Sequence, residues 1–276
     1  EGWTLISTVE NDEQLTGEKF MTATYSCPTS DKYQYFRWEI TAVRDPKNDC
    51  VQASEFSLVQ ATPFVEWNKT AKALTFKFGN KPEAGQPADE NCQYYEINQQ
   101  TVDYPAWREA LQGGVTKAFF DNSFKYFQPT TCRAWFRDGV CLTSIEGMEN
   151  LNTDAVTDMG RMFYYCAQLK SIDLTHFNTA QVKSMQAMFH FCESLTTLDV
   201  SRFSTANVTD MSQMFYNCKQ LTTLDVSQFN TAQVTDMSHM FAFCENLRPL
   251  DLSEFTTANV TNMTEMFSNC SQLQTI

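Results

Sequence analysis

Apolar residues in the second half of the chain recur with a period of 26 residues. Each repeat carries a methionine followed directly by a phenylalanine, and a cysteine lies three residues after that phenylalanine. The cysteines are Cys166, Cys192, Cys218, Cys244 and Cys270. A period of roughly 20–50 residues is typical of a solenoid, in which each unit buries its apolar face only against its neighbours. The pattern therefore predicts five stacked repeats in residues 151–276, the last of them incomplete.

Each repeat is predicted to contain one short helix. In the repeat that ends at Cys218, the residues Met211, Met214 and Phe215 have the spacing of one helix face. Asp210 precedes Met211, and the equivalent residues of the other repeats are Asp, Ser or Asn, which are strong N-cap residues. The helix is therefore expected to begin at Met211, and the acid before it needs no ligand to explain it.

Each repeat is also predicted to contain one short strand. Leu224 and Val226 alternate with Asp225 and Ser227, which places the apolar pair inward and the polar pair outward. Stacked strands lie about 4.8 Å apart and packed helices about 8–10 Å apart, so the strands are expected to line the inner curve. The expected fold class is an α/β leucine-rich-repeat-like solenoid with a concave parallel sheet, preceded by a mostly β N-terminal region.

The repeats resemble the leucine-rich repeats of BspA-like bacterial surface proteins over residues 151–276, with about fifteen of 26 positions in agreement. Residues 115–150 resemble a degenerate, aromatic-rich first coil that caps the array. Its apolar residues Trp135, Phe136, Leu142 and Ile145 keep the spacing of the later repeats. The resemblance implies a secreted or cell-surface binding protein, of a kind often attributed to adhesion.

The first 110 residues are predicted to be mostly β. Residues 33–43 and 51–59 alternate strongly, and they resemble the closing strands of a discoidin-like (galactose-binding-like) jelly roll. Residues 1–62 are therefore assigned to a β region that contains part of such a domain. Residues 63–114 are assigned to a β hairpin and linker, with a strand at 72–78, a return strand at 94–97 and a short helix after Trp107.

Charge and hydropathy exclude two classes of partner. The net charge is −13 and the acidity is spread over both halves of the chain, so no basic stripe is present to bind a nucleic-acid backbone. No apolar run reaches 18 residues, so the segment is not expected to insert into a membrane. The chain opens with Glu1-Gly2-Trp3, which we interpret as the result of leader removal or as a piece of a longer protein.

The repeat cysteines are predicted to be buried, reduced core thiols. They share a predicted helix face with Met and Phe, and metal sites favour clustered Cys-x₂-Cys pairs instead of cysteines one repeat apart. No cofactor and no metal site are expected, although calcium at the aspartate column described next stays an alternative. The remaining cysteines leave one or two disulfides open: Cys27, Cys50, Cys92, Cys132 and Cys141.

One outward aspartate per repeat forms the first candidate binding surface. The column consists of Asp173, Asp199, Asp225 and Asp251, with Ser201 and Ser227 beside it. Neighbouring carboxylates about 5 Å apart repel each other by roughly 0.8 kcal/mol even at the dielectric constant of water. They therefore need compensation, either from hydrogen bonds to the adjacent Ser/Thr column or from a calcium ion or basic partner.

An aromatic strip is the alternative binding surface. It lies between the phenylalanine and cysteine columns and consists of Tyr164, Tyr165, Phe191, Tyr216 and Phe243. Aromatic side chains with a polar tip are typical interface anchors. The competing interpretation is that these rings fold onto the next coil.

The sequence favours a non-catalytic binding protein over an enzyme. His176, His190 and His239 stand in three different repeat columns, and no Ser-His-Asp order or phosphate-binding loop is present. We expect an extracellular or cell-surface protein that presents its repeats to a host or neighbouring-cell protein or glycan. The alternative is a carbohydrate-binding module, formed by the N-terminal β region, on a structural repeat stalk. A spacer without any ligand is a third interpretation.

Overall fold

The computed structural model divides the chain into two compact units, which are described one at a time. The first comprises residues 1–63 and 78–83, and the second comprises residues 64–77 and 84–276. The structure describes residues 4–8, 20–21, 23–26, 36–44, 51–82, 90–97 and 103–274. Within these residues, no helix is long and apolar enough to cross a membrane.

Antiparallel strands make up the described part of the first unit. The strand β1 (Thr4–Thr8) pairs with β3 (Ala23–Ser26), and β4 (Phe36–Arg44) lies between β2 (Phe20–Met21) and β5 (Val51–Gln60). The two predicted strands are therefore confirmed as β4 and β5, although residues 33–35 and the turn at 45–50 lie outside the described residues. The resemblance to a discoidin-like jelly roll stays a prediction.

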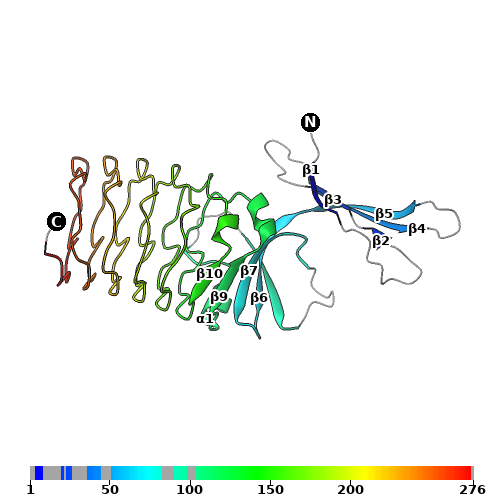
Figure 1. The fold of residues 1–276 in the computed structure, drawn as a ribbon, viewed down its shortest axis with the longest axis horizontal. Coiled ribbons are helices and arrows are strands. Elements are labelled where there is room, and N and C mark those ends of the chain that lie inside the picture. Colours follow the sequence, from blue (N-terminus) through cyan, green and yellow to red (C-terminus); the bar gives the residue numbers. More distant parts are fainter. Residues whose placement is uncertain are drawn as a thin grey trace. The chain divides into compact units, whose positions relative to one another are not determined.

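A mixed sheet opens the second unit (Figure 1). Its order is β10-β9-β7-β6-β8, in which β9 runs parallel to both of its neighbours and β8 is antiparallel to β6. The strands are β6 (Thr62–Asn68), β7 (Ala73–Gly79), β8 (Cys92–Glu96), β9 (Lys117–Phe120) and β10 (Ser144–Glu146). The predicted strand at 72–78 is confirmed as β7, and the predicted return strand forms β8, whose partner is β6.

Short helical segments accompany this sheet. The predicted helix is α1 (Arg108–Gln112), and two 3₁₀ segments follow, η1 (Asn122–Tyr126) and η2 (Met148–Asn150). Strands from the predicted linker and from the predicted capping coil thus share one sheet, since β6, β7 and β8 lie beside β9 and β10. The array therefore begins on a β layer instead of a separate hairpin.

An aromatic core joins the sheet to the first coil. Phe76 of β7 stacks on Phe120 at a centroid distance of 4.4 Å and on Trp135 at 5.6 Å. The indole Nε1 of Trp107 donates a hydrogen bond to the carbonyl oxygen of Trp135 at 2.7 Å. Phe136 in turn lies parallel to Phe163 at 5.6 Å. The residues predicted to cap the array are therefore buried, and they continue directly into the core of the repeats.

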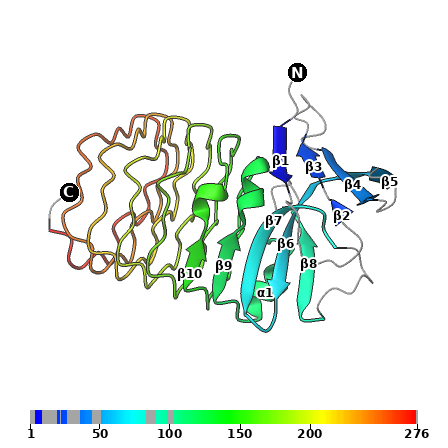
Figure 2. The ribbon, with the colours of Figure 1, turned by 45° about the vertical axis from the view of Figure 1, so that its right-hand side comes forward.

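Successive repeats form coils that lie side by side, drawn in yellow-green to red in Figures 1 and 2. Their core columns are buried as predicted: Met214, Phe215 and Cys218 are fully buried, and so are the equivalent residues of the neighbouring coils. The phenylalanine rings of adjacent coils stack at 5.5–5.8 Å. Periodicity alone therefore identified the core correctly.

The predicted helix in each coil is wrong. Between residues 151 and 274, where every residue is described, the chain contains turns and no helix. Gln213 and Asn217 have φ values of 58° and 60°, and the equivalent residues of every other coil are also left-handed. A residue in this conformation ends a right-handed helical turn. The segment is therefore a run of tight turns, which happens to repeat its inward side chains at helical spacing.

These turns hydrogen-bond to the next coil. The amides of Met211, Gln213, Phe215 and Asn217 donate to the carbonyl oxygens of the following coil at 2.8–3.0 Å. The amides between them close local turns, as in the bond from Met214 N to Met211 O at 3.2 Å. Alternate amides therefore bond between coils, and a helix could not supply these bonds, because a helix keeps its amide bonds within itself. We call this the turn side of the coil stack.

The predicted parallel sheet on the opposite side is also wrong. Leu224 and Val226 point inward and Asp225 is exposed, as the alternation indicated. Across the fully described coils, however, no hydrogen bond joins the backbone of 198–200 to that of 224–226. Backbone pairing needs a spacing of about 4.8 Å between coils, and the coils reach it on the turn side instead. We call the surface that carries the outward aspartates the Asp face.

Candidate functional site

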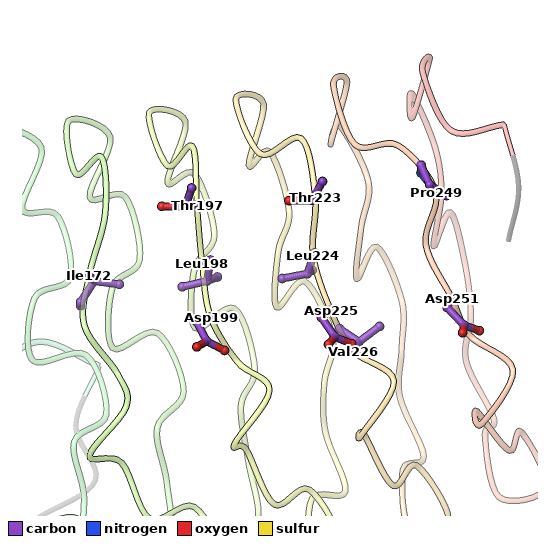
Figure 3. Close-up of a pocket in the computed structure, with 10 residues that line it drawn as sticks. All are labelled: Ile172, Thr197, Leu198, Asp199, Thr223, Leu224, Asp225, Val226, Pro249 and Asp251. Atoms are coloured by element: carbon purple, nitrogen blue, oxygen red, sulfur yellow. The ribbon is translucent and has the colours of Figure 1, made fainter.

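A groove crosses the Asp face. It has a volume of about 520 Å³ and extends over segments of four coils, as Figure 3 shows. Leu198 and Leu224 form part of its apolar floor, while Asp199, Asp225 and Asp251 lie in a row along it. The remaining lining residues are Ile172, Thr197, Thr223, Val226 and Pro249. The structure therefore brings three of the four predicted aspartates together in one groove.

Each aspartate is held by a local hydrogen-bond motif. The Oδ1 atom of Asp225 accepts from both the amide and the hydroxyl of Ser227, at 3.0 and 2.7 Å. Asp199 makes the same pair of bonds with Ser201 at 3.0 and 2.7 Å. Asp173 does so with Thr175 at 2.9 and 2.6 Å. This confirms the predicted hydrogen bonding between the aspartates and the adjacent Ser/Thr column.

These bonds keep the carboxylates ionised. The hydroxyl and then the amide of Ser227 lower the pKa of Asp225, and the charges of Asp199 and Asp251 oppose this shift. Hydrogen bonds from Ser201 and Thr175 likewise lower the pKa of Asp199 and of Asp173. Bonds to the charged form favour it, so a row of negative charges persists at neutral pH.

One carboxylate oxygen of each motif is left for a partner. Both hydrogen bonds of Asp173, Asp199 and Asp225 go to Oδ1, and none reaches Oδ2 within the described repeats. In the part of the chain that the structure describes, no group of three or more His, Cys, Asp or Glu is placed to hold a metal ion, and this includes the aspartate column. The Oδ2 atoms of the row can accept hydrogen bonds or ion pairs from a ligand, and calcium at the aspartate column stays a prediction.

The aromatic strip lies on the turn side and is packed against itself. Tyr164 stacks on His190 at 4.4 Å and His190 on Tyr216 at 4.6 Å, with interplanar angles of 8° and 9°. Tyr165 and Phe243 join at the edges, with centroid distances of 5.1 Å to Phe191 and 5.3 Å to Tyr216. The competing interpretation is confirmed, because the rings fold onto the next coil and use their faces for each other.

Histidine placement departs from the sequence analysis in one respect. His190 and His239 stand in different columns, yet both contact the ring of Tyr216, at 4.6 and 6.2 Å. Burial, and secondly the charge of Arg161, lower the pKa of His190 to about 4. At neutral pH this imidazole is therefore uncharged and serves as one ring of the stack.

The repeat cysteines are core thiols with a specific hydrogen bond. The Sγ atoms of Cys166, Cys192, Cys218 and Cys244 are fully buried and donate to a backbone carbonyl of the preceding coil at 3.1–3.3 Å. Burial raises the pKa of each of these four thiols. The thiol is therefore inert, as a buried apolar environment dictates. Cys270 makes the same bond but is only half-buried.

The other cysteines leave the disulfide question partly open. Cys132 is a buried free thiol and Cys141 an exposed one. Cys92 lies in β8. Cys27 and Cys50 lie outside the described residues, so pairing that involves them stays a prediction.

Sequence reasoning missed a cluster of arginines where the coils begin. Arg133 and Arg161 both contact the carboxylate of Asp103, at 3.2 and 2.6 Å, and Arg137 donates to the carbonyl oxygen of Asp103 at 2.8 Å. These residues share no repeat column, so periodicity could not bring them together. One local signal existed: Gly160 stands where the later coils have Gln186, Ser212, Ser238 and Thr264.

The repeats match a known protein family. A family model described as "Mycoplasma protein of unknown function, DUF285" matches residues 130–225 and again 196–276, which together make up more than half of the chain. The chain belongs to the DUF285 family. The match begins at residue 130, where the first inter-coil bond joins Thr157 N to Thr130 O at 2.9 Å. The DUF285 region therefore coincides with the hydrogen-bonded coils.

The DUF285 assignment carries no function with it. It is compatible with the predicted resemblance to BspA-like surface proteins. No curated protein and no solved structure matches the chain. A function for this DUF285 protein must therefore be argued from its own residues.

Proposed function

We propose that this chain is a non-catalytic binding protein, secreted or attached to a cell surface. In this proposal the coils are a solenoid of the BspA-like leucine-rich-repeat type, and the Asp face is its binding surface. The supporting observation is the groove of about 520 Å³ in which Asp199, Asp225 and Asp251 lie in a row. A row that repeats once per coil suits an extended partner, because each coil meets an equivalent part of it.

The Asp face supports binding better than the aromatic strip does. Rings bind sugars or partner side chains through their faces, and the faces of Tyr164, His190 and Tyr216 are already stacked on one another. The groove, by contrast, offers carboxylate oxygens without an intramolecular partner. Its walls also carry backbone groups, such as the amides of Leu224 and Val226, that make no bond to another described residue.

The electrostatics select a cationic partner. The carboxylates repel one another, and the shared repulsion falls when positive groups lie between them. Each exposed ion pair contributes only about 0–1 kcal/mol, so useful affinity needs several pairs along the row. We therefore infer that the partner is an extended polypeptide segment, or a glycan, that carries amino or guanidinium groups at regular intervals.

A cationic peptide tests the proposal directly. The probe is a fluorescent peptide of alternating lysine and serine, and binding to the full chain is followed by anisotropy at low and at physiological ionic strength. We expect the double variant Asp199→Asn with Asp225→Asn to lose binding at least tenfold. The wild-type affinity should fall as salt is added, because screening weakens exposed charge pairs.

A matched control separates the groove from net charge. The double variant Asp154→Asn with Glu146→Gln also removes two negative charges, but at exposed positions that do not line the groove. This control should bind like the wild type. Equal losses in both double variants would contradict a site on the Asp face. Salt-independent glycan binding that survives in Asp199→Asn with Asp225→Asn would instead favour recognition by the N-terminal β region.

A further inference from the structure

The arginine cluster missed by the sequence analysis holds a dipeptide of the chain itself. Four of the eight arginines in the sequence surround Asp103 and Tyr104, although the chain as a whole carries a net charge of −13. The four are Arg108, Arg133, Arg137 and Arg161, and all belong to the second unit. Such a concentration of positive charge around two residues calls for an explanation.

Asp103 is bound as a ligand would be. Its Oδ1 atom accepts from Arg161 Nη1 at 2.6 Å and from Arg133 Nη2 at 3.2 Å. Arg137 Nη1 donates to the backbone oxygen of the same residue at 2.8 Å. Although burial opposes it, the hydrogen bond from Arg133 and the charges of Arg161, Arg133 and Arg137 lower the pKa of Asp103. The cluster thus binds both the side-chain carboxylate and the backbone carbonyl of Asp103.

Tyr104 is recognised in two ways. Its ring centroid lies 3.8 Å from the guanidinium carbon of Arg108 and 4.1 Å from that of Arg137. Arg137 Nη2 also donates to the tyrosine hydroxyl at 3.1 Å. Cation–π contact selects an aromatic ring, and the hydroxyl bond favours tyrosine over phenylalanine.

Other residues fix the positions of Arg133 and Arg137. Arg137 lies over the ring of Tyr164 at 5.1 Å, and Arg133 contacts Asp158 at 3.5 Å. Gly160 makes room for Arg133, since a Cβ there would lie 2.5 Å from its Nη1 atom. In two later coils the residue equivalent to Gly160 is a serine whose hydroxyl donates to the aspartate two residues before it, Ser212 to Asp210 at 2.7 Å and Ser238 to Asp236 at 2.6 Å. At Asp158 the bond to Oδ1 comes from the amide of Gly160, at 2.7 Å, and Arg133 contacts Oδ2.

The occupant is more exposed than its receptor. The side chain of Asp103 is 57% exposed, whereas those of Arg133 and Arg137 are 14% exposed. Arg161 and Arg108 are 27% and 41% exposed. Exposed ion pairs are weak, so the occupant can be exchanged while Arg133 and Arg137, which are largely covered, keep their positions. Trp107 anchors the following residues independently, through burial and its bond to Trp135.

We propose that this arginine cluster is a recognition site for an acidic–aromatic dipeptide, Asp-Tyr or its equivalent, in a partner polypeptide, and that Asp103 and Tyr104 occupy it in the free chain. Arginine clusters are a common means of binding acidic motifs, because their planar fork matches a carboxylate. The internal dipeptide competes with the partner, so an external segment binds strongly only when the internal one is displaced. This proposal does not depend on ligand binding at the Asp face.

Opening the site tests the proposal. The full chain with Asp103→Asn and Tyr104→Ala loses the occupant but keeps all four arginines. The probe is a labelled pentapeptide of the sequence Val-Asp-Tyr-Pro-Ala, which copies residues 102–106. We expect the opened variant to bind it at least tenfold more tightly than the wild type. Probes with Asn for Asp, or Ala for Tyr, should bind at least tenfold more weakly than the parent peptide.

Two further variants complete the test. Arg161→Ala in the opened background should abolish peptide binding, while Arg248→Ala, at an exposed arginine of a distant coil, should leave it unchanged. Asp103→Asn alone serves as a second opened form if the double variant does not fold, and it should show the same selectivity at lower affinity. Absence of binding to a folded opened variant would overturn the proposal. Equal binding of the Asp and Asn probes, or full competition by inorganic sulfate without preference for tyrosine, would reduce the cluster to a general anion site and overturn it as well.

Discussion

The turn side and the Asp face of the coil stack are made from the same repeat, yet the turn side pairs alternate amides along its length, whereas the Asp-face segment makes isolated inter-coil bonds only where it begins, as from Arg248 N to Thr222 O at 3.0 Å. On the turn side, amides such as Gln213 N donate to the next coil at 2.8 Å. On the Asp face, no hydrogen bond joins the backbone of residues 198–200 to that of residues 224–226 in the next coil, and a groove lies there instead. One side thus sets the spacing of the coils, and the other is left available for a partner.

Inward and outward positions differ in how much they vary between coils. Core columns on the turn side repeat Met, Phe and Cys, because each must fit between its copies in the two adjacent coils. The residue that follows the Asp-x-Ser/Thr motif does not enter the core, and it reads His176, Arg202, Gln228 and Glu254 in successive coils. Packing therefore fixes the residue type at inward positions, while an outward position such as this one can vary.

A pair of glycine substitutions tests the turn geometry. Ala187 has a φ of 52°, whereas Ala242 is not among the residues with positive φ. A left-handed conformation costs an L-residue about 1–2 kcal/mol, and glycine avoids this cost. We expect the free energy of unfolding of Ala187→Gly to exceed that of Ala242→Gly by about 1–2 kcal/mol, since both lose a buried methyl group. Urea denaturation measures this difference, and equal destabilisation of both variants would point back to a helix.

The smallest expected effect concerns the aspartate motif. Because hydrogen bonds lower the folded-state pKa of Asp225, its contribution to stability is present above the unfolded value of about 3.9 and is lost as the pH falls through the lower folded value. Ser227→Ala removes the hydroxyl bond, so the pKa of Asp225 should rise. NMR titration of the carboxyl carbon measures the change. Thr223→Ala, in the same groove without a bond to Asp225, should leave the pKa where it is.

Burial could be predicted well from the sequence, and backbone conformation could not. Burial follows from periodicity, and the Met, Phe, Cys, Leu and Val columns are inside as expected in the inner coils, while Met263 of the last coil is 49% exposed. Helical spacing, however, is also produced by consecutive turns in which every fourth residue is left-handed. Asn217 and Asn269 carried the signal for that conformation, since Asn tolerates positive φ well. Tyr165, Phe191 and Phe243 occupy the same column and obscured it.

The two candidate sites also differ in how far the sequence predicts them. The Asp-x-Ser/Thr motif is local in sequence, so its hydrogen bonds could be predicted from one repeat. The arginine cluster joins residues 103 to 161 through the packing of α1 and the first coil onto one surface, and no local pattern encodes that meeting. Its one sequence signal, Gly160, acquires meaning only when Arg133 is seen beside it.

Native-state hydrogen exchange, resolved by residue, tests the central claim most directly. We expect the amides of Gln213 and Phe215 to be protected by their inter-coil bonds and those of Leu224 and Val226 to exchange faster by orders of magnitude. This contrast should recur in each coil. Strong protection of Leu224 and Val226 would show that the Asp face pairs its backbone as a sheet, and it would contradict the account.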